Sequence, residues 1–216
     1  MTRIISRTCG ASTRTARSLI ALLAIATLGS TVACAPSSGW TPVQIGFFNP
    51  GQLFTQETDV HGMRISVPYT RNENLYGLDA GIASTAETLT GVQTNFLFNG
   101  AQDARALQMT ICMNSSIQAK GVQMSVFNLV EQNFTGLQLG GLVNTAGDAK
   151  GAQIAGIHNR SESIVGLQIS SLVNETNDLR GLQLGALNFN DSGPLPFFPI
   201  FNFGWGSDSD EDEDEE

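Results

Sequence analysis

Amide side chains are the polar groups that recur most regularly along this chain. A primary amide both donates and accepts hydrogen bonds, so equal amides stacked at strand spacing can bond to one another. The spacing therefore predicts two structural ladders of side-chain amides rather than a row that binds a ligand. The glutamines of the first ladder are fifteen residues apart: Gln93, Gln108, Gln123, Gln138, Gln153, Gln168 and Gln183. The asparagines of the second ladder follow glutamines by six residues: Asn99, Asn114, Asn144, Asn159 and Asn174.

The residues that usually carry catalysis or bind metals are few and scattered. His61 and His158 are the only histidines, and no pair of Cys or His residues has the spacing of a zinc site. Cys112 stands where other repeats have Leu, Ile or Phe, so we expect it to be a small buried hydrophobic residue. The sequence contains no glycine-rich phosphate loop and no Gly-x-Ser-x-Gly elbow. We therefore expect no enzyme activity, no cofactor and no metal ion.

The amino-terminal residues have the pattern of a secretory signal. Four arginines precede the apolar run 19–28, and small residues follow it. The run is too short for a permanent transmembrane helix. Residues 31–34, Thr-Val-Ala-Cys, resemble a bacterial lipobox with a lipid on Cys34, whereas the small residues around Cys34 also fit ordinary cleavage after Ala35. The first interpretation gives a lipoprotein and the second a secreted protein. Both predict export to the cell envelope or surface, either attached to the outer membrane or in the periplasm.

Negative charge is concentrated at the carboxyl end. The chain has a formal net charge of −9 at pH 7, and eight acidic residues lie between Asp208 and Glu216. A run of like charges repels itself, so we expect residues 207–216 to form a disordered, solvated tail. The acidic balance argues against nucleic acid as a partner.

A strict repeat organises the chain between these ends. A glycine precedes nearly every ladder glutamine by two residues, and ten units of about fifteen residues extend from Pro42 to Asn190. Counted from the glycine, positions two, four and seven are apolar, and position five is small or polar. The alternation at positions two and four is strand geometry, whereas the slip near positions five and six, like the glycine, indicates a bend. Short strands joined by bends at a fixed length predict an all-β fold, a parallel β-solenoid of about ten coils.

The repeat also predicts which side chains face the interior. If positions two, four and seven point inward, the glutamines at position three point outward. The asparagines at position nine then lie inside, where they can satisfy backbone groups at a bend. The alternative fold is an up-and-down antiparallel β-barrel or meander with one strand per unit. Antiparallel neighbours do not stack equal positions, so the identical columns favour the solenoid.

The predicted organisation has five parts. A signal peptide occupies residues 1–34, a short tether residues 35–41, and the solenoid residues 42–190. Residues 191–206 are rich in Pro and Phe, and the acidic tail follows them. Because proline cannot continue a central strand ladder, we expect residues 191–206 to cap the end of the stack.

The units resemble a family of bacterial exported surface-repeat proteins, which carry tandem Gly-Leu-Gln-[Leu/Ile]-Gly units after a signal peptide. The entry PVQIGFFNP (42–50) and the exit GPLPFFPIFNF (193–203) are similar to the flanks of that family. The resemblance implies export or surface association and no particular chemistry.

We therefore expect an envelope-associated repeat protein with a structural or partner-binding role, as an adhesin or scaffold. One alternative is a carbohydrate- or envelope-binding module that uses polar rows along one face, and another is an outer-membrane β-barrel. The sequence does not identify the partner. A protein, a glycan, or a membrane reached through a lipid on Cys34 all remain open.

Overall fold

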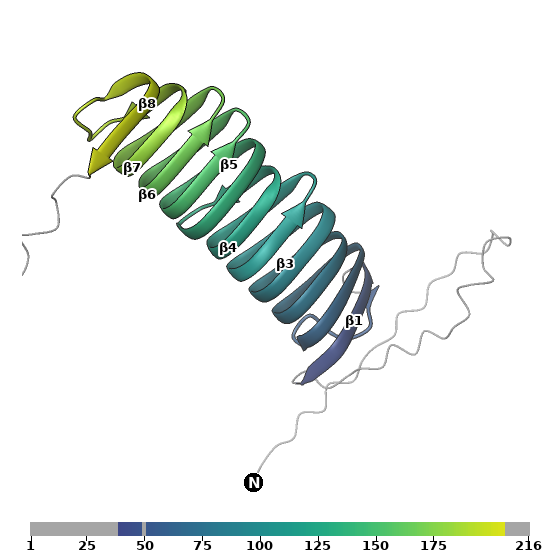
Figure 1. Cartoon of the computed structure of the whole chain (residues 1–216). Coiled ribbons are helices and arrows are strands. Elements are labelled where there is room, and N and C mark those ends of the chain that lie inside the picture. Colours follow the sequence, from purple (N-terminus) through teal and green to yellow (C-terminus); the bar gives the residue numbers. More distant parts are fainter. Residues whose placement is uncertain (1–38, 49–50, 206–216) are drawn as a thin grey trace, which may run out of the picture. The chain divides into compact units, whose positions relative to one another are not determined.

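The computed structural model describes residues 39–48 and 51–205 (Figure 1). The predicted signal peptide, the lipidation site Cys34 and the acidic tail lie outside these residues. No helix of the length and hydropathy needed to cross a bilayer occurs among the described residues. The strands are β1 (Trp40–Phe48), β2 (Gly51–Gln52), β3 (Asp59–Thr110), β4 (Met113–Val130), β5 (Asn133–Ala155), β6 (His158–Ser170), β7 (Val173–Asn190) and β8 (Phe197–Trp205).

Successive coils are parallel, and equal positions of the repeat pair with one another. Between β4 and β5, Gly121 pairs with Gly136 and Gln123 pairs with Gln138. The same register joins β3 to β4, β5 to β6, and β6 to β7. This stacking confirms the predicted parallel β-solenoid, which makes about nine turns (Figure 1). It also excludes an antiparallel meander for the described residues.

The glycine column marks one bend of each coil. Gly136 and Gly151 have φ angles of 135° and 128°, in the region that L side chains rarely adopt. A Cβ atom on Gly151 would overlap the carbonyl oxygen of Gly136 in the preceding coil. At these two positions glycine is therefore required both by the backbone conformation and by the close approach of neighbouring coils, as the repeat predicted for this bend.

We expect Gly151→Ala to lower the free energy of unfolding by about 1–3 kcal/mol, because alanine is strained at this φ and has no room for its methyl group. The matched control is Ala106→Gly, which puts glycine into the one regular unit that lacks it and should change stability by less than about 1 kcal/mol. Urea unfolding followed by circular dichroism measures both effects. Equal stability of Gly151→Ala and the unchanged chain would contradict the role assigned to the glycine column.

The interior of the solenoid contains buried amide columns beside an apolar column at position fourteen, which contradicts the predicted orientation of two sets of residues. The ladder glutamines are buried, with Gln138 at 0% exposure, although the sequence was interpreted to place them outside. The apolar residues at positions two, four and seven face outward instead, as Ile154 and Leu172 do with 37% and 51% of their surface exposed. The asparagines at position nine are buried, as predicted.

The reason for the error is the location of the second bend. Positions six and seven both face outward and form a bend in several coils, as at Gly156 and Ile157. Positions three and five therefore share the inner side of the first segment, and positions two and four share its outer side. Position fourteen also faces inward and forms the apolar part of the interior. Alanines such as Ala119 and larger residues such as Phe134 and Ile164 share this column.

Both ends of the stack are closed by antiparallel strands. β2 pairs with β1, and β8 pairs with β7 so that Leu182 lies opposite Phe203 and Gln183 lies opposite Asn202. Asn202 is buried whereas Phe203 is exposed, so β8 continues the inside–outside pattern of the coils. The segment expected to be a cap thus contributes the last strand of the sheet.

Candidate binding surface

The glutamine column forms a continuous ladder of hydrogen bonds inside the solenoid. Each Nε2 donates to the Oε1 of the glutamine one coil earlier, from Gln108 to Gln93 and onward to Gln183. The donor–acceptor distances are 2.7–3.0 Å. Because these amides are buried and bonded to one another, they are not available as a polar row for a glycan or a protein at the surface.

The asparagine column forms a second ladder that also holds the backbone at a bend. Asn144 Nδ2 donates to Asn159 Oδ1 at 3.0 Å and also to the backbone oxygens of Gln138 and Ile154. These bonds give the backbone carbonyls on both sides of the bend a side-chain donor, and buried carbonyls need donors. The asparagine ladder therefore satisfies backbone groups at the bend, as the sequence predicted.

Two members of this second ladder were missed by the sequence analysis. Asn128 donates to Asn144 Oδ1 at 2.8 Å, and Asn174 donates to Asn188 Oδ1 at 2.8 Å. Asn128 and Asn188 stand at position eight of their units, one residue before the column that the other asparagines define. A register shift between Ser125 and Phe127 brings Asn128 into line with Asn144. An Asn at position eight, in a unit without Asn at position nine, is the signal that could have found them.

The two ladders run in opposite directions. Glutamines donate to the preceding coil, whereas asparagines donate to the following one, as Asn99 does to Asn114. Each ladder ends on a different kind of group. The first glutamine, Gln93, donates to the Asp79 carboxylate and to Ser84. The last asparagine, Asn188, donates to the backbone oxygen of Phe198 in β8.

A buried ion pair replaces the amides at the amino-terminal end of the glutamine column. Arg64 and Asp79 occupy position three of two successive units, and both side chains have 0% exposure. Arg64 Nη2 lies 2.8 Å from Asp79 Oδ2, and Arg64 Nε lies 3.0 Å from Asp79 Oδ1. Arg64 Nη1 also donates to the backbone oxygen of Thr85 at 3.0 Å. The pair thus keeps the column continuous with charges in place of amides.

The carboxylate of Asp79 is held ionised by its surroundings. Burial has the largest single effect and would raise the pKa of Asp79, but the Arg64 charge and the hydrogen bonds from Arg64, Ser84 and Ser66 together lower it by more. The net effect is a pKa below the ordinary value of an aspartate. We regard this cluster as the anchor of the glutamine ladder, since it lies in the interior and its groups are bonded to one another.

The other residues singled out in the sequence lie apart from one another. Cys112 is exposed, so the prediction that it is buried is wrong; it belongs to the outward-facing bend at positions six and seven. His158 is partly exposed, and its Nε2 lies 3.4 Å from a carboxylate oxygen of Glu175. His61 is exposed, and its ring centroid lies 4.7 Å from that of Tyr76. The structure does not bring these three residues together.

The outward apolar residues form one continuous surface, which we call the apolar face. It comprises the side chains at positions two, four, six and seven of each coil. In the seven regular units from Gly91 onward, none of these residues is charged. The column at position two extends from Val43 in β1 to Phe203 in β8, about 48 Å at a strand spacing of about 4.8 Å. The other side of the solenoid exposes acidic residues, including Glu131, Asp148 and Glu162.

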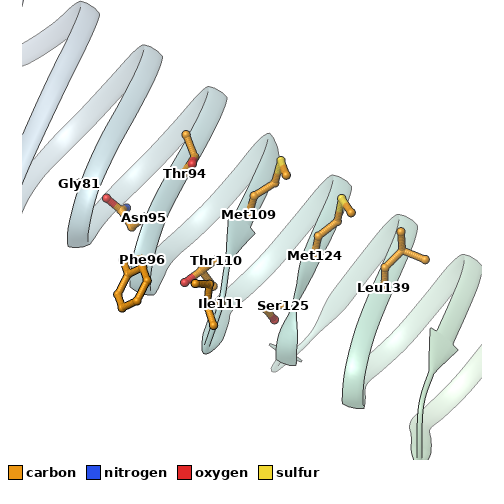
Figure 2. A pocket seen from close by; sticks show the side chains of 10 residues that line it. All are labelled: Gly81, Thr94, Asn95, Phe96, Met109, Thr110, Ile111, Met124, Ser125 and Leu139. Carbon is orange, nitrogen blue, oxygen red and sulfur yellow. The ribbon is translucent and has the colours of Figure 1, made fainter.

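A groove runs along part of the apolar face (Figure 2). Its volume is about 630 Å³. Figure 2 shows one wall as a row across four successive coils: Thr94, Met109, Met124 and Leu139. Phe96 and Ile111 at position six form the opposite wall. The chain at position five, where side chains turn inward, lies between the walls at Asn95, Thr110 and Ser125. Later units have Gly141 and Gly156 at position six, so the wall that Phe96 and Ile111 form has no side chain at those positions.

A row of mainly basic and aromatic residues borders the apolar face, and we call it the edge row. It consists of the outward residues that directly precede the glycine column. Six of its members are basic or aromatic: His61, Tyr76, Arg105, Lys120, Lys150 and Arg180. Thr90, Thr135 and Val165 are the others, and Trp205 lies opposite Arg180 in register. A shallow hollow of about 480 Å³ separates Arg105 and Lys120 from the apolar residues Leu107 and Val122. Positive charge and apolar surface therefore meet along this border.

Comparison with known proteins does not extend this description. No protein-family model matches the chain, and no curated protein or solved structure matches it. The resemblance to exported surface-repeat proteins therefore remains a prediction from the repeat and its flanks. The candidate site is accordingly defined by geometry alone: the apolar face, its groove and the edge row.

Proposed function

We propose that this protein is an exported, non-catalytic scaffold of the cell envelope that binds its partner through the apolar face. The observation that carries the proposal is the absence of charge from the outward positions two, four, six and seven of the regular units, combined with their exposure. Soluble monomers rarely expose a contiguous apolar patch of more than a few hundred Å², and larger patches mark interaction surfaces. A surface about 48 Å long at strand spacing is of that kind.

The sequence features outside the described residues support the same function. The amino-terminal signal pattern supports export, and the lipobox-like residues 31–34 support a lipid on Cys34. Six residue steps separate Cys34 from Trp40, the first residue of β1. At about 3.3–3.6 Å per residue, such a tether reaches about 20 Å at most. A lipid on Cys34 would therefore keep the first coil close to the membrane that holds it.

The proposal is tested by separating the lipid from the apolar face. In bacteria that produce the full chain, we expect a palmitate analogue to label the chain and to label Cys34→Ala at background level. We further expect Cys34→Ala to stay largely in the envelope fraction, because the apolar face still binds there. Met109→Glu and Ile154→Glu put charges on exposed positions of the apolar face. Adding both to the Cys34→Ala chain should move most of the protein to the soluble fraction.

The control for added charge is Asn133→Glu with Asn177→Glu, which changes two exposed residues of the opposite side of the solenoid. This variant in the Cys34→Ala chain should remain in the envelope fraction. If Cys34→Ala is soluble without any change to the apolar face, or if both pairs of glutamates release it equally, the proposed binding role of the apolar face is wrong.

A further inference from the structure

We propose that the apolar face lies flat on an anionic lipid bilayer, with the edge row at the level of the lipid headgroups. This inference rests on the proposed function and names the partner that the apolar face binds. It concerns the folded solenoid itself and holds whether or not Cys34 carries a lipid.

The composition and regularity of the apolar face fit a bilayer. Its columns place equal positions of successive coils above one another, so the same outward positions can meet a flat surface along the whole stack. At the carboxyl end, β8 extends the columns with Phe201 and Phe203 opposite Leu184 and Leu182. An uncharged surface of this kind can enter the boundary between headgroups and acyl chains without burying a charge.

The edge row supplies the charge that an anionic bilayer requires. Arg105, Lys120, Lys150 and Arg180 lie beside the apolar face rather than within it. Long basic side chains at such a border reach the headgroups while the neighbouring apolar residues contact acyl chains. The shallow hollow between Arg105 and Lys120 on one side and Leu107 and Val122 on the other has both surfaces that a lipid phosphate and its chain need.

The arginines of the edge row pair with carboxylates two residues earlier in the chain. Asp103 lies 3.8 Å from Arg105, and Asp178 lies 3.9 Å from Arg180. At the amino-terminal end, Glu57, Asp59 and Glu73 line a hollow together with His61. Asp103 and Asp178 both stand at position thirteen, two residues before the arginines. They are therefore farther along the chain from the apolar face, which begins at position two of the next unit. The exposed acids Glu131, Asp148 and Glu162 also stand at positions eleven to thirteen. In the regular units the basic residues thus lie next to the apolar face and the acidic residues lie beyond them, the order that a negatively charged membrane favours.

Aromatic residues stand at both ends of the edge row. His61 and Tyr76 are at the amino-terminal end, and the ring of Trp40 lies 5.9 Å from that of His61. Trp205 is at the other end, 72% exposed, with its ring 5.6 Å from that of Phe203. Trp and Tyr are enriched at the level of lipid headgroups, because their rings are apolar with one polar group. The row therefore has aromatic residues at its ends and basic residues at four positions between them.

Flotation with lipid vesicles tests this inference. The purified full chain with Cys34→Ala is mixed with vesicles of phosphatidylcholine and phosphatidylglycerol or with vesicles of phosphatidylcholine alone. We expect the protein to float with the anionic vesicles and several-fold less with the neutral ones. Met109→Glu with Ile154→Glu should reduce the bound fraction at least tenfold, and Lys120→Gln with Lys150→Gln should reduce it several-fold. Asn133→Glu with Asn177→Glu should bind anionic vesicles nearly as well as the Cys34→Ala chain does.

Circular dichroism and thermal melting establish that each variant is folded, so loss of binding is not loss of structure. The inference is overturned if the folded chain does not float, or if glutamates on the apolar face leave flotation unchanged. It is also overturned if analytical ultracentrifugation shows a dimer that the same glutamates dissociate and that binds no vesicles, because the occupant is then a second copy. If one of these results is found while retention in the envelope fraction still depends on the apolar face, the proposed function stands and the partner is a different one.

Discussion

Asp79→Ala is expected to destabilise the protein by about 3–5 kcal/mol, the cost of leaving the partner of a buried ion pair without its counter-charge. Arg64 has 0% exposure and binds Asp79 through both Nε and Nη2. The substitution also removes the acceptor to which Gln93 Nε2 donates at 3.2 Å, although Ser84 still accepts from it. Denaturant unfolding, with circular dichroism as the signal, measures the loss.

The decisive control replaces both charges with the amide that occupies this column elsewhere. Arg64→Gln combined with Asp79→Gln removes the buried charges together and allows the ladder to continue from Gln93 toward Gln44. Replacing a buried ion pair with well-matched uncharged residues is often neutral or stabilising, so we expect the double variant to recover most of the stability lost by Asp79→Ala. If the double variant is as unstable as Asp79→Ala, glutamines cannot replace this ion pair in the column.

The same pair gives acid sensitivity with a defined sign. The pKa of Asp79 is lowered in the folded state, so its contribution to stability is present above the unfolded value of about 3.9. That contribution is lost as the pH falls below this value and through the folded pKa. The double glutamine variant lacks the carboxylate, so below about pH 4 it should lose less stability than the unchanged chain.

The second large effect is expected from the asparagine ladder. Asn144→Ala leaves the backbone oxygens of Gln138 and Ile154 without this donor, and it interrupts the bonds to Asn128 and Asn159. An unsatisfied buried polar group costs about 1–3 kcal/mol, so we expect each ladder substitution to cost about 2–4 kcal/mol. Asn144→Ala with Asn159→Ala should therefore lower the melting temperature strongly.

The matched control for this pair is Asn177→Ala, which truncates an exposed asparagine of the same domain. Surface substitutions of this kind usually change stability by less than about 0.5 kcal/mol. Thermal melting by circular dichroism compares the variants under the same conditions. An unchanged melting temperature for Asn144→Ala with Asn159→Ala would show that the ladder does not hold the bends.

The period of the repeat was sufficient to predict the parallel stack. A fifteen-residue spacing without insertions is needed only if each coil lies on the one before it, as the pairing of Gly121 with Gly136 shows. The amide ladders follow from the same register, because stacking places Gln123 beside Gln138 at hydrogen-bond distance. Regular spacing thus determined which residues are neighbours along the axis.

Spacing did not determine which side of each strand faces inward. That choice depends on where the chain bends, and the bend at Gly156 and Ile157 lies one residue beyond the predicted position. The rule that apolar side chains are buried failed at positions two, four and seven because a stacked amide such as Gln138 is satisfied by its neighbours and can occupy the interior instead. The apolar face, the edge row and the groove could not be predicted while the orientation was reversed.

The supply of one ladder glutamine and one ladder asparagine by each regular unit has a consequence for the evolution of this chain. Each regular unit supplies one glutamine that donates to the coil before it and one asparagine that donates to the coil after it. A duplication or loss of one whole unit within the regular stack therefore recreates every amide bond across the new junction. The specialised groups at the ends, the Asp79 carboxylate and the Phe198 carbonyl, are unaffected. Such a gene can change the length of its product in whole repeats while the coils keep the same internal bonding.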